Sequence, residues 1–317
     1  MKYQQGQIVE QRAAIGDALV EFGGDYPDLV VLDPDVAASS RSQAFGKKYP
    51  QRFYEVGIAE QNCVGIAAGL SSLGYIPFVS AFATFLTHRS GDQIRNSIAH
   101  TRANVKLNGA YGGLPTGGAG ATHACFEDLA LMRVLPNMVV FDPADAVEAR
   151  LLVKLALDTE GPFYLRSVRC GVPVVFDESY RVEIGKAVWL REGRDISLIS
   201  TGMMTPRVMG AADVLTKQGI SVTHIHMPCI KPLDREAVIK ASQTGLIITV
   251  ENHSVIGGLG GAVAELCSAE FPSRIKRLGF QDLFLESGDD EVLFDSYGLS
   301  EQKIINAAQD ALRNHRN

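Results

Sequence analysis

The sequence is poor in cysteine and has no excess of positive charge. Its cysteines are odd in number and none of them has C-x-x-C spacing: Cys63, Cys125, Cys170, Cys229 and Cys267. This pattern is typical of buried thiols in a reducing compartment, and it argues against a disulfide framework or a zinc site. A net charge of −6, with no local basic stripe, argues against a nucleic-acid partner.

Long apolar runs are also missing. No stretch reaches the roughly 18 uninterrupted apolar residues of a membrane span, and the opening "MKYQQGQIVE" lacks the apolar core of a signal peptide. We therefore expect a cytoplasmic protein with no membrane partner. What is present is ordinary globular composition, 46% hydrophobic and 21% charged, over 317 residues. That length favours two domains over one.

Strand-like and helix-like segments alternate along the chain. Short apolar runs typical of strands occur at 29–36, 75–82, 105–111, 138–145 and 162–169, and helical patterns at 9–27, 60–72, 88–102 and 146–159. Such alternation implies a parallel sheet covered by helices on both faces. The pattern breaks at 173–185, and a smaller version of it follows. The sequence thus predicts an α/β fold of two mainly parallel-sheet domains, at 1–172 and 186–317, joined by a linker at 173–185.

Chemically reactive side chains follow several of the predicted strands. Asp35 ends one strand and Phe82 another, while His123 closes the glycine-rich stretch "GGLPTGGAGATH". Arg166 and Arg169 lie at the end of a further strand. Because ligands bind beyond the carboxyl ends of strands in open parallel sheets, we expect the functional site at this edge.

Several longer stretches carry a family resemblance. "GIAEQN…GIAAGL", "IPFVSAFATFLTHRSGDQIRN", "GATH" and "LPNMVVFDPAD" together resemble the C-terminal part of the transketolase family. This family includes 1-deoxyxylulose-5-phosphate synthase and the β subunits of 2-oxo acid dehydrogenase E1 components. Further on, "VENHSVIGGLGGAVAELC" and "RLGFQDLFLESG" are similar to the family's C-terminal domain. The resemblance covers essentially the whole chain. It implies a pyrimidine-binding domain, a transketolase C-terminal-like domain and thiamine diphosphate as cofactor.

One carboxylate, Glu60, stands at the edge of a long run of small and apolar residues, "YEVGIAEQNCVGIAAGL". From the residues alone, the ordinary interpretation is an acidic side chain that binds backbone N–H groups at a helix N-terminus. The resemblance implies a catalytic role instead, in which Glu60 binds ring nitrogen N1′ of the cofactor's aminopyrimidine. Apolar surroundings suit that role, because they let a carboxyl group hold or share a proton near neutral pH.

The resemblance also assigns further residues to the cofactor. It implies that Phe82 and Phe85 pack against the aminopyrimidine, which suits a flat heteroaromatic ring. On spacing alone, two phenylalanines at i, i+3 are ordinary core residues. The resemblance places Asp35, Ile58 and His88 at the cofactor as well, although contact by His88 is an open alternative.

Substrate contacts are implied for three residues. The resemblance places His123 beside the reacting ring, where a histidine can move protons or bind substrate oxygens. It aligns Arg166 and Arg169 with residues that hold a substrate phosphate, which a planar guanidinium suits. An ion pair is the alternative for each arginine.

The chain departs from the transketolase pattern beside this histidine. Gly118 and Ala119 stand where many transketolases carry acidic residues, and Tyr111 stands where another substrate-facing histidine is expected. These differences suggest a sugar other than the usual pentose phosphates.

The family also needs an N-terminal-type module that holds the diphosphate through Mg²⁺, carried by a G-D-G segment and a later asparagine. Only "SGDQIRN" comes near this pattern, inside a predicted helix. We therefore expect half an enzyme with no metal ligands of its own. A partner subunit would carry the Mg²⁺ and diphosphate site, and by resemblance the assembly would be an α₂β₂ heterotetramer.

The expected activity is transfer of a two-carbon ketol unit from a phosphorylated or otherwise anionic ketose to an aldehyde. Three alternatives stay open at this point. One is an E1 β subunit of a 2-oxo acid dehydrogenase, another is a 1-deoxyxylulose-5-phosphate synthase-like condensing enzyme, and the third is a non-catalytic paralogue.

Overall fold

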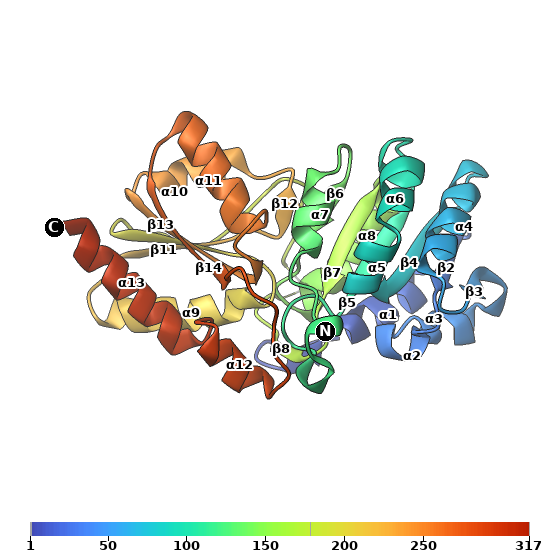
Figure 1. Cartoon of the computed structure of the whole chain (residues 1–317), viewed down its shortest axis with the longest axis horizontal. Helices are drawn as coiled ribbons and strands as arrows, with labels where there is room; N and C mark the ends of the chain where they lie inside the picture. Colours follow the sequence, from blue (N-terminus) through green and yellow to red (C-terminus); the bar gives the residue numbers. More distant parts are fainter. Residues whose placement is uncertain (1, 178, 317) are drawn as a thin grey trace.

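The structure is a computed structural model that describes residues 2–177 and 179–316. Two sheets, each with helices packed against it, follow one another along the long axis of the molecule (Figure 1). Most neighbouring strands in both sheets are parallel. The expected α/β fold with two mainly parallel sheets is therefore confirmed.

The first sheet has the strand order β12-β6-β7-β5-β4-β2-β3 within the described residues. Its strands are β2 (Leu29–Asp33), β3 (Phe53–Glu55), β4 (Ile76–Phe82), β5 (Lys106–Ala110), β6 (Val139–Phe141), β7 (Phe163–Ser167) and β12 (Cys229–Lys231). Its helices are α1 (Gln11–Phe22), α2 (Ala37–Ser40), α3 (Gln43–Lys48), α4 (Glu60–Ser72), α5 (Ala83–Arg89), α6 (Gly91–Gln93), α7 (Asp128–Val134) and α8 (Ala146–Asp158). Short irregular helices lie at η1 (Pro50–Arg52), η2 (Ile94–Ala99) and η3 (Gly117–Thr122).

The second sheet has the order β14-β13-β10-β11-β9. Its strands are β9 (Val188–Arg191), β10 (Ile196–Ser200), β11 (Val222–His226), β13 (Leu246–Ser254) and β14 (Arg274–Phe280). Its helices are α9 (Met204–Lys217), α10 (Arg235–Ser242), α11 (Leu259–Glu270), α12 (Asp290–Ser296) and α13 (Glu301–Arg316). A separate antiparallel ribbon joins β1 (Ile8–Glu10) to β8 (Gly171–Pro173).

The two halves share strands, which the sequence did not predict. β12 follows β11 in the chain, yet it pairs antiparallel with β6 of the first sheet. The division of the chain into domains at 1–172 and 186–317 with a linker at 173–185 therefore stays a prediction. In space, the second half contributes the edge strand β12 to the first sheet.

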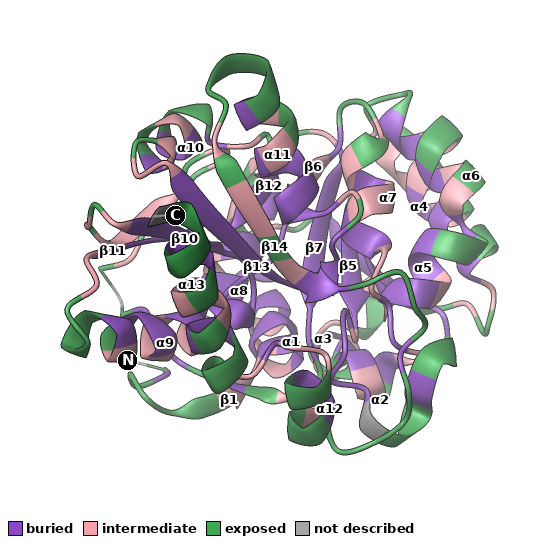
Figure 2. Ribbon diagram, turned by 60° about the vertical axis from the view of Figure 1, so that its left-hand side comes forward, coloured by how far each residue is buried: buried purple, intermediate pink, exposed green. Residues whose placement is uncertain are grey.

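The first sheet is buried on both faces. In β2, Leu29 and Val31 pack into a core with α1 and α8, while Val30 and Leu32 pack into a core with α4 and α5. Figure 2 shows β5 and β7 of this sheet buried, and exposed residues on the outer faces of the helices. A continuous apolar run such as "LVVL" is what a strand covered on both faces requires. Within 2–177 and 179–316, no helix is long and apolar enough to span a membrane.

The register of the parallel strands aligns their carboxyl ends at the edge where the functional site is expected. Phe82 of β4 pairs with Ala110 of β5, which pairs with Ser167 of β7. These three strands therefore end at one level, and the segments after them, including α5 and Tyr111, begin side by side. The helix expected at 88–102 is different in the structure: α5 starts at Ala83, directly after β4.

Candidate functional site

An aromatic cluster forms where β4 and β5 end, and it consists of Phe82, Phe85, Tyr111 and His123. The rings of Phe82 and Phe85 have centroids 5.8 Å apart, and Tyr111 lies 4.3 Å from Phe82. His123 meets Phe85 edge-on at 5.2 Å and Phe82 at 6.1 Å. Tilted and edge-on contacts at these distances are favourable for aromatic rings. Residues from three separate segments therefore form one apolar, flat-sided surface.

Glu60 lies close to this cluster, as the first residue of α4. Its side chain is only 4% exposed, and both carboxylate oxygens accept hydrogen bonds from Nη1 of Arg89, at 2.9 and 3.2 Å. The Arg89 guanidinium in turn lies 4.0 Å from the centre of the Phe85 ring. Within the described residues, no backbone N–H of α4 binds the carboxylate. The environment of Glu60 is therefore apolar on one side and cationic on the other, whereas the sequence indicated only the apolar side.

Two other residues assigned by resemblance are exposed on loops at this edge. Asp35 follows β2 with a positive φ of 66°, and Ile58, 74% exposed, precedes α4. The last residue of β2, Asp33, is buried and accepts hydrogen bonds from the hydroxyls of Ser40 and Ser42. Burial raises the pKa of Asp33 to about 6. Asp33 thus fixes the loop after β2, while Asp35 and Ile58 face outward.

His88 is engaged by a carboxylate. Its Nε2 lies 2.5 Å from Oε1 of Glu127, and this carboxylate also accepts the N–H of Phe126. Burial raises the pKa of Glu127 above its ordinary value. The structure thus places His88 against the residue that precedes α7.

Arg166 requires a correction. It was expected to bind a substrate phosphate, but its side chain is fully buried in β7. Its Nη2 donates to Asp128 and to the carbonyl of Cys125, both at 2.9 Å, and its Nη1 donates to the carbonyl of Asn252 at 2.8 Å. A guanidinium with these partners and no exposed surface joins the two halves of the molecule, and a substrate does not reach it.

Arg169 is exposed and lies near the cluster. Its guanidinium is 5.8 Å from the Tyr111 ring, and its Nη1 donates weakly to the carbonyl of Thr116 at 3.4 Å. Arg12 of α1 approaches the same ring at 5.3 Å and donates to the Tyr111 hydroxyl at 2.7 Å. Arg12 was not predicted from the sequence. The one signal for it was a charged residue inside the otherwise apolar face of "RAAIGDAL".

The chemical character of the site therefore changes from one end to the other. A carboxylate, Glu60, lies at one end, the aromatic cluster in the middle, and the two guanidinium groups of Arg12 and Arg169 at the other end. Such a surface suits a flat ring that offers an N–H group to Glu60 and a second molecule with an anionic group beside the arginines.

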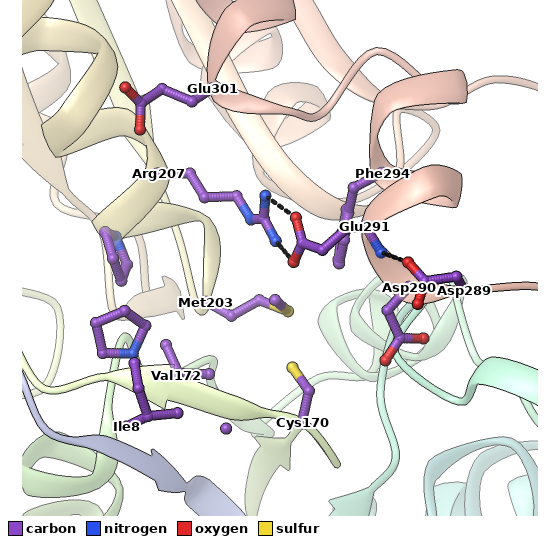
Figure 3. A pocket seen from close by; sticks show the side chains of 13 residues that line it. Ile8, Cys170, Val172, Met203, Arg207, Asp289, Asp290, Glu291, Phe294 and Glu301 are labelled. Atoms are coloured by element: carbon purple, nitrogen blue, oxygen red, sulfur yellow. Dashed lines mark hydrogen bonds and ion pairs between the residues drawn. The ribbon is translucent and has the colours of Figure 1, made fainter.

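A separate cavity of about 560 Å³ lies between the β1–β8 ribbon and helices α9 and α12 (Figure 3). Two of its charged groups are engaged within the chain: Arg207 binds Glu291 through both terminal nitrogens, and Asp289 accepts backbone N–H groups at the start of α12. The aromatic residue in its described lining, Phe294, is fully buried, and its ring is covered by the Arg207 guanidinium at 4.5 Å. The aromatic cluster is thus the better candidate.

Comparison with known proteins identifies the family. Residues 8–173 match the transketolase pyrimidine-binding domain, and residues 185–304 match the transketolase C-terminal domain. The chain belongs to the transketolase family. Among its relatives, the 6-deoxy-6-sulfo-D-fructose transketolase subunit SqwH of a Clostridium species is 37% identical, covering 93% of this chain and 92% of that protein. An apulose-4-phosphate transketolase subunit of Phocaeicola vulgatus is also 37% identical, covering 95% and 97%.

One solved structure has the same fold over nearly the whole length of this chain. It is described as a split-gene transketolase in an inactive β₄ tetramer, is 44% identical and has a TM-score of 0.90. The alignment covers 96% of this chain and 99% of that one. The chain therefore resembles separately encoded transketolase C-terminal subunits along its full length.

Proposed function

We propose that this chain is the β-type subunit of a two-chain, thiamine diphosphate-dependent transketolase. It would transfer a two-carbon ketol unit from an anionic ketose to an aldehyde. The observation that carries the proposal is the buried carboxylate of Glu60 beside the aromatic cluster, at the edge where the parallel strands end. Relatives named as transketolase subunits support the same interpretation.

The residues at this edge fit the pyrimidine half of the cofactor. Glu60 would hydrogen-bond ring nitrogen N1′ and hold or share the proton between them, while Phe82 and Phe85 offer the flat apolar contact that the ring needs. Asp35 and Ile58 are exposed in the segments after β2 and before α4, and they are assigned to the rest of the cofactor's surroundings. When bound, thiamine diphosphate supplies the carbanion that attacks the ketose carbonyl.

His123 is assigned to the substrate. The Thr122 hydroxyl lies 2.9 Å from its Nδ1, which leaves Nε2 as the ring nitrogen available to a ligand. Its edge contacts with Phe82 and Phe85 orient the ring beside the proposed pyrimidine site. From there His123 would bind substrate oxygens and move protons to and from them.

The substrate is proposed to carry an anionic group far from its carbonyl. Arg169 and Arg12 flank Tyr111 at the end of the site opposite Glu60, and guanidinium groups suit phosphate or sulfonate oxygens. The two relatives above are named for a sulfonated and a phosphorylated sugar. His88, held by Glu127, would act at the rim of the site.

A second subunit is proposed to hold Mg²⁺ and the diphosphate, with an α₂β₂ assembly working in the cytoplasm. The relatives named as subunits support a partner, and so does the solved split-gene structure, whose β-only tetramer is described as inactive. All five cysteines of this chain are unpaired thiols, which suits a reducing compartment.

The test is a reconstitution. The purified chain is combined with an N-terminal-type subunit of the same organism, thiamine diphosphate and Mg²⁺, and ketol transfer is measured with phosphorylated, sulfonated and neutral ketoses. We expect activity only in the mixture, for anionic donors, with loss in Glu60→Gln. Arg169→Met should raise KM for the anionic donor, whereas Arg194→Met, at an exposed turn, should not.

The same assay separates the alternatives. Acyl transfer from a 2-oxo acid to a lipoyl group, without ketol transfer, would make the chain an E1 β subunit. Condensation of pyruvate with glyceraldehyde 3-phosphate would instead assign it to the synthase branch. A mixture that binds no thiamine diphosphate would leave the non-catalytic interpretation.

A further inference from the structure

Arg89 covers both groups on which the proposed pyrimidine site depends. Its Nη1 binds the two oxygens of Glu60, and its guanidinium lies 4.0 Å from the centre of the Phe85 ring. The Glu60 side chain is 4% exposed, whereas that of Arg89 is 47% exposed. The partly exposed guanidinium of Arg89 thus contacts the buried carboxylate of Glu60 and the ring of Phe85 at the same time.

This arrangement differs from that of a structural arginine. Arg166 is fully buried and donates to a carboxylate and two carbonyl groups. Within the described residues, the side chain of Arg89 donates hydrogen bonds to Glu60 alone. Because Glu60 is buried, the carboxylate that Arg89 leaves needs another hydrogen-bonding partner, which a bound ligand can supply. Arg89 can therefore turn into solvent when a ligand takes its place at Glu60, while the fully buried Arg166 cannot.

A guanidinium and an aminopyrimidine with a protonated or hydrogen-bonding ring nitrogen have similar recognition chemistry. Both are flat and delocalised, both offer an N–H group to a carboxylate, and both pack against an aromatic ring. Glu60 and Phe85 provide these two contacts together. One of the two groups must leave when the other binds.

We propose that Arg89 is a positioning residue that occupies the pyrimidine site of the unloaded chain and is displaced when an aminopyrimidine binds. The inference rests on the proposed function, because it takes Glu60 and Phe85 as the pyrimidine contacts. In the absence of ligand, Arg89 holds both side chains in place and neutralises the buried carboxylate. Its removal should strengthen pyrimidine binding, since the ligand then displaces no ion pair.

Thiamine, which lacks the diphosphate, is a suitable probe for the full-length chain, because it depends on the pyrimidine contacts. Its dissociation constant would be measured by ligand-observed NMR titration, which detects weak binding. Arg89→Met should bind thiamine roughly three- to tenfold more tightly than the wild type. Arg89→Lys keeps the charge and should stay near the wild type, as should Arg95→Met, at a nearby exposed arginine that binds Asn96.

The same substitution in a Glu60 variant tests whether the gain in affinity depends on the ion pair with Glu60. In Glu60→Gln the ion pair is absent, so adding Arg89→Met should give no further gain in affinity. If the wild type binds thiamine and Arg89→Met binds it equally or more weakly, the displacement proposal is wrong and the proposed function stands. If neither the wild type nor Arg89→Met binds thiamine, the pyrimidine site itself is wrong and both proposals fall.

Discussion

Removal of the Asp128 carboxylate should unfold the protein at a markedly lower temperature while leaving the surface of the candidate site in place. Asp128 is fully buried and accepts hydrogen bonds from Arg166 at 2.9 Å and from the Tyr164 hydroxyl at 2.7 Å. Asp128→Ala leaves the Arg166 cation with one other carboxylate, that of Asp142, 3.8 Å away. Burial raises the pKa of Asp142 to about 6, so this group is a poor replacement.

The magnitude follows from these contacts. Breaking a buried ion pair by removing one partner costs about 3–5 kcal/mol, because an uncompensated charge stays in the core. The loss of the acceptor for Tyr164 adds to this cost. With an entropy of unfolding of about 2.1 cal/mol/K per residue, this loss lowers the melting temperature of a 317-residue chain by roughly 4–8 °C.

The assay is thermal unfolding of the full-length chain followed by circular dichroism. The matched control is Asp158→Asn, which removes an exposed carboxylate paired with Lys154 and should change the free energy of unfolding by about 0.5 kcal/mol or less. An unchanged melting temperature in Asp128→Ala would refute the structural role of Arg166. Loss of anionic-donor binding in Arg166→Met at unchanged stability would restore the phosphate interpretation.

Three further predictions follow from other parts of the molecule. Tyr111→Phe removes one of two acceptors of Arg12 Nη1, the other being the carbonyl of Ser39, so KM for the anionic donor should rise several-fold at little change in kcat, measured by steady-state kinetics of the reconstituted enzyme. Gly113→Ala places a Cβ within 2.1 Å of the Asn252 side chain at a φ of +76°, and urea unfolding should show a loss of at least about 1 kcal/mol; equal midpoints would contradict this. Burial lowers the pKa of His224 to about 3. Below about pH 6.5 the unfolded chain therefore takes up a proton at His224 that the folded chain does not, and the free energy of unfolding decreases as the pH decreases. His224→Gln removes that loss, so urea unfolding at pH 7, 6 and 5 should show the variant gaining on the wild type by up to about 1.4 kcal/mol per pH unit, and a constant difference would contradict the assignment.

The sequence predicted those parts of the fold that depend on local pattern. The apolar runs of β2 and β4 are buried on both faces, and such strands need uninterrupted hydrophobic residues. The helix after β4 was expected too late, because "ATFLTHR" lacks an N-cap residue and follows the strand without a turn. β12 was missed because its pairing with β6 joins residues far apart in the sequence.

The site was predictable only in part, for a related reason. Glu60 and the two phenylalanines stand in stretches that resemble the family, so they were assigned without the structure. Arg166 was misassigned because nothing local shows that Asp128 and the carbonyl of Asn252 surround it. Arg89 and Arg12 were missed, since their partners, Glu60 and Tyr111, lie in other segments.

The most direct test of the proposed half-site is the binding of thiamine diphosphate, measured by isothermal titration calorimetry in the presence of Mg²⁺. Three samples are titrated: this chain alone, the N-terminal-type subunit alone, and their mixture. We expect tight, stoichiometric binding in the mixture, much weaker binding by either chain alone, and loss of the tight phase when Glu60→Gln replaces the wild-type chain. Equally tight binding by the isolated chain, or no binding by the mixture, would contradict the division of the site between two subunits.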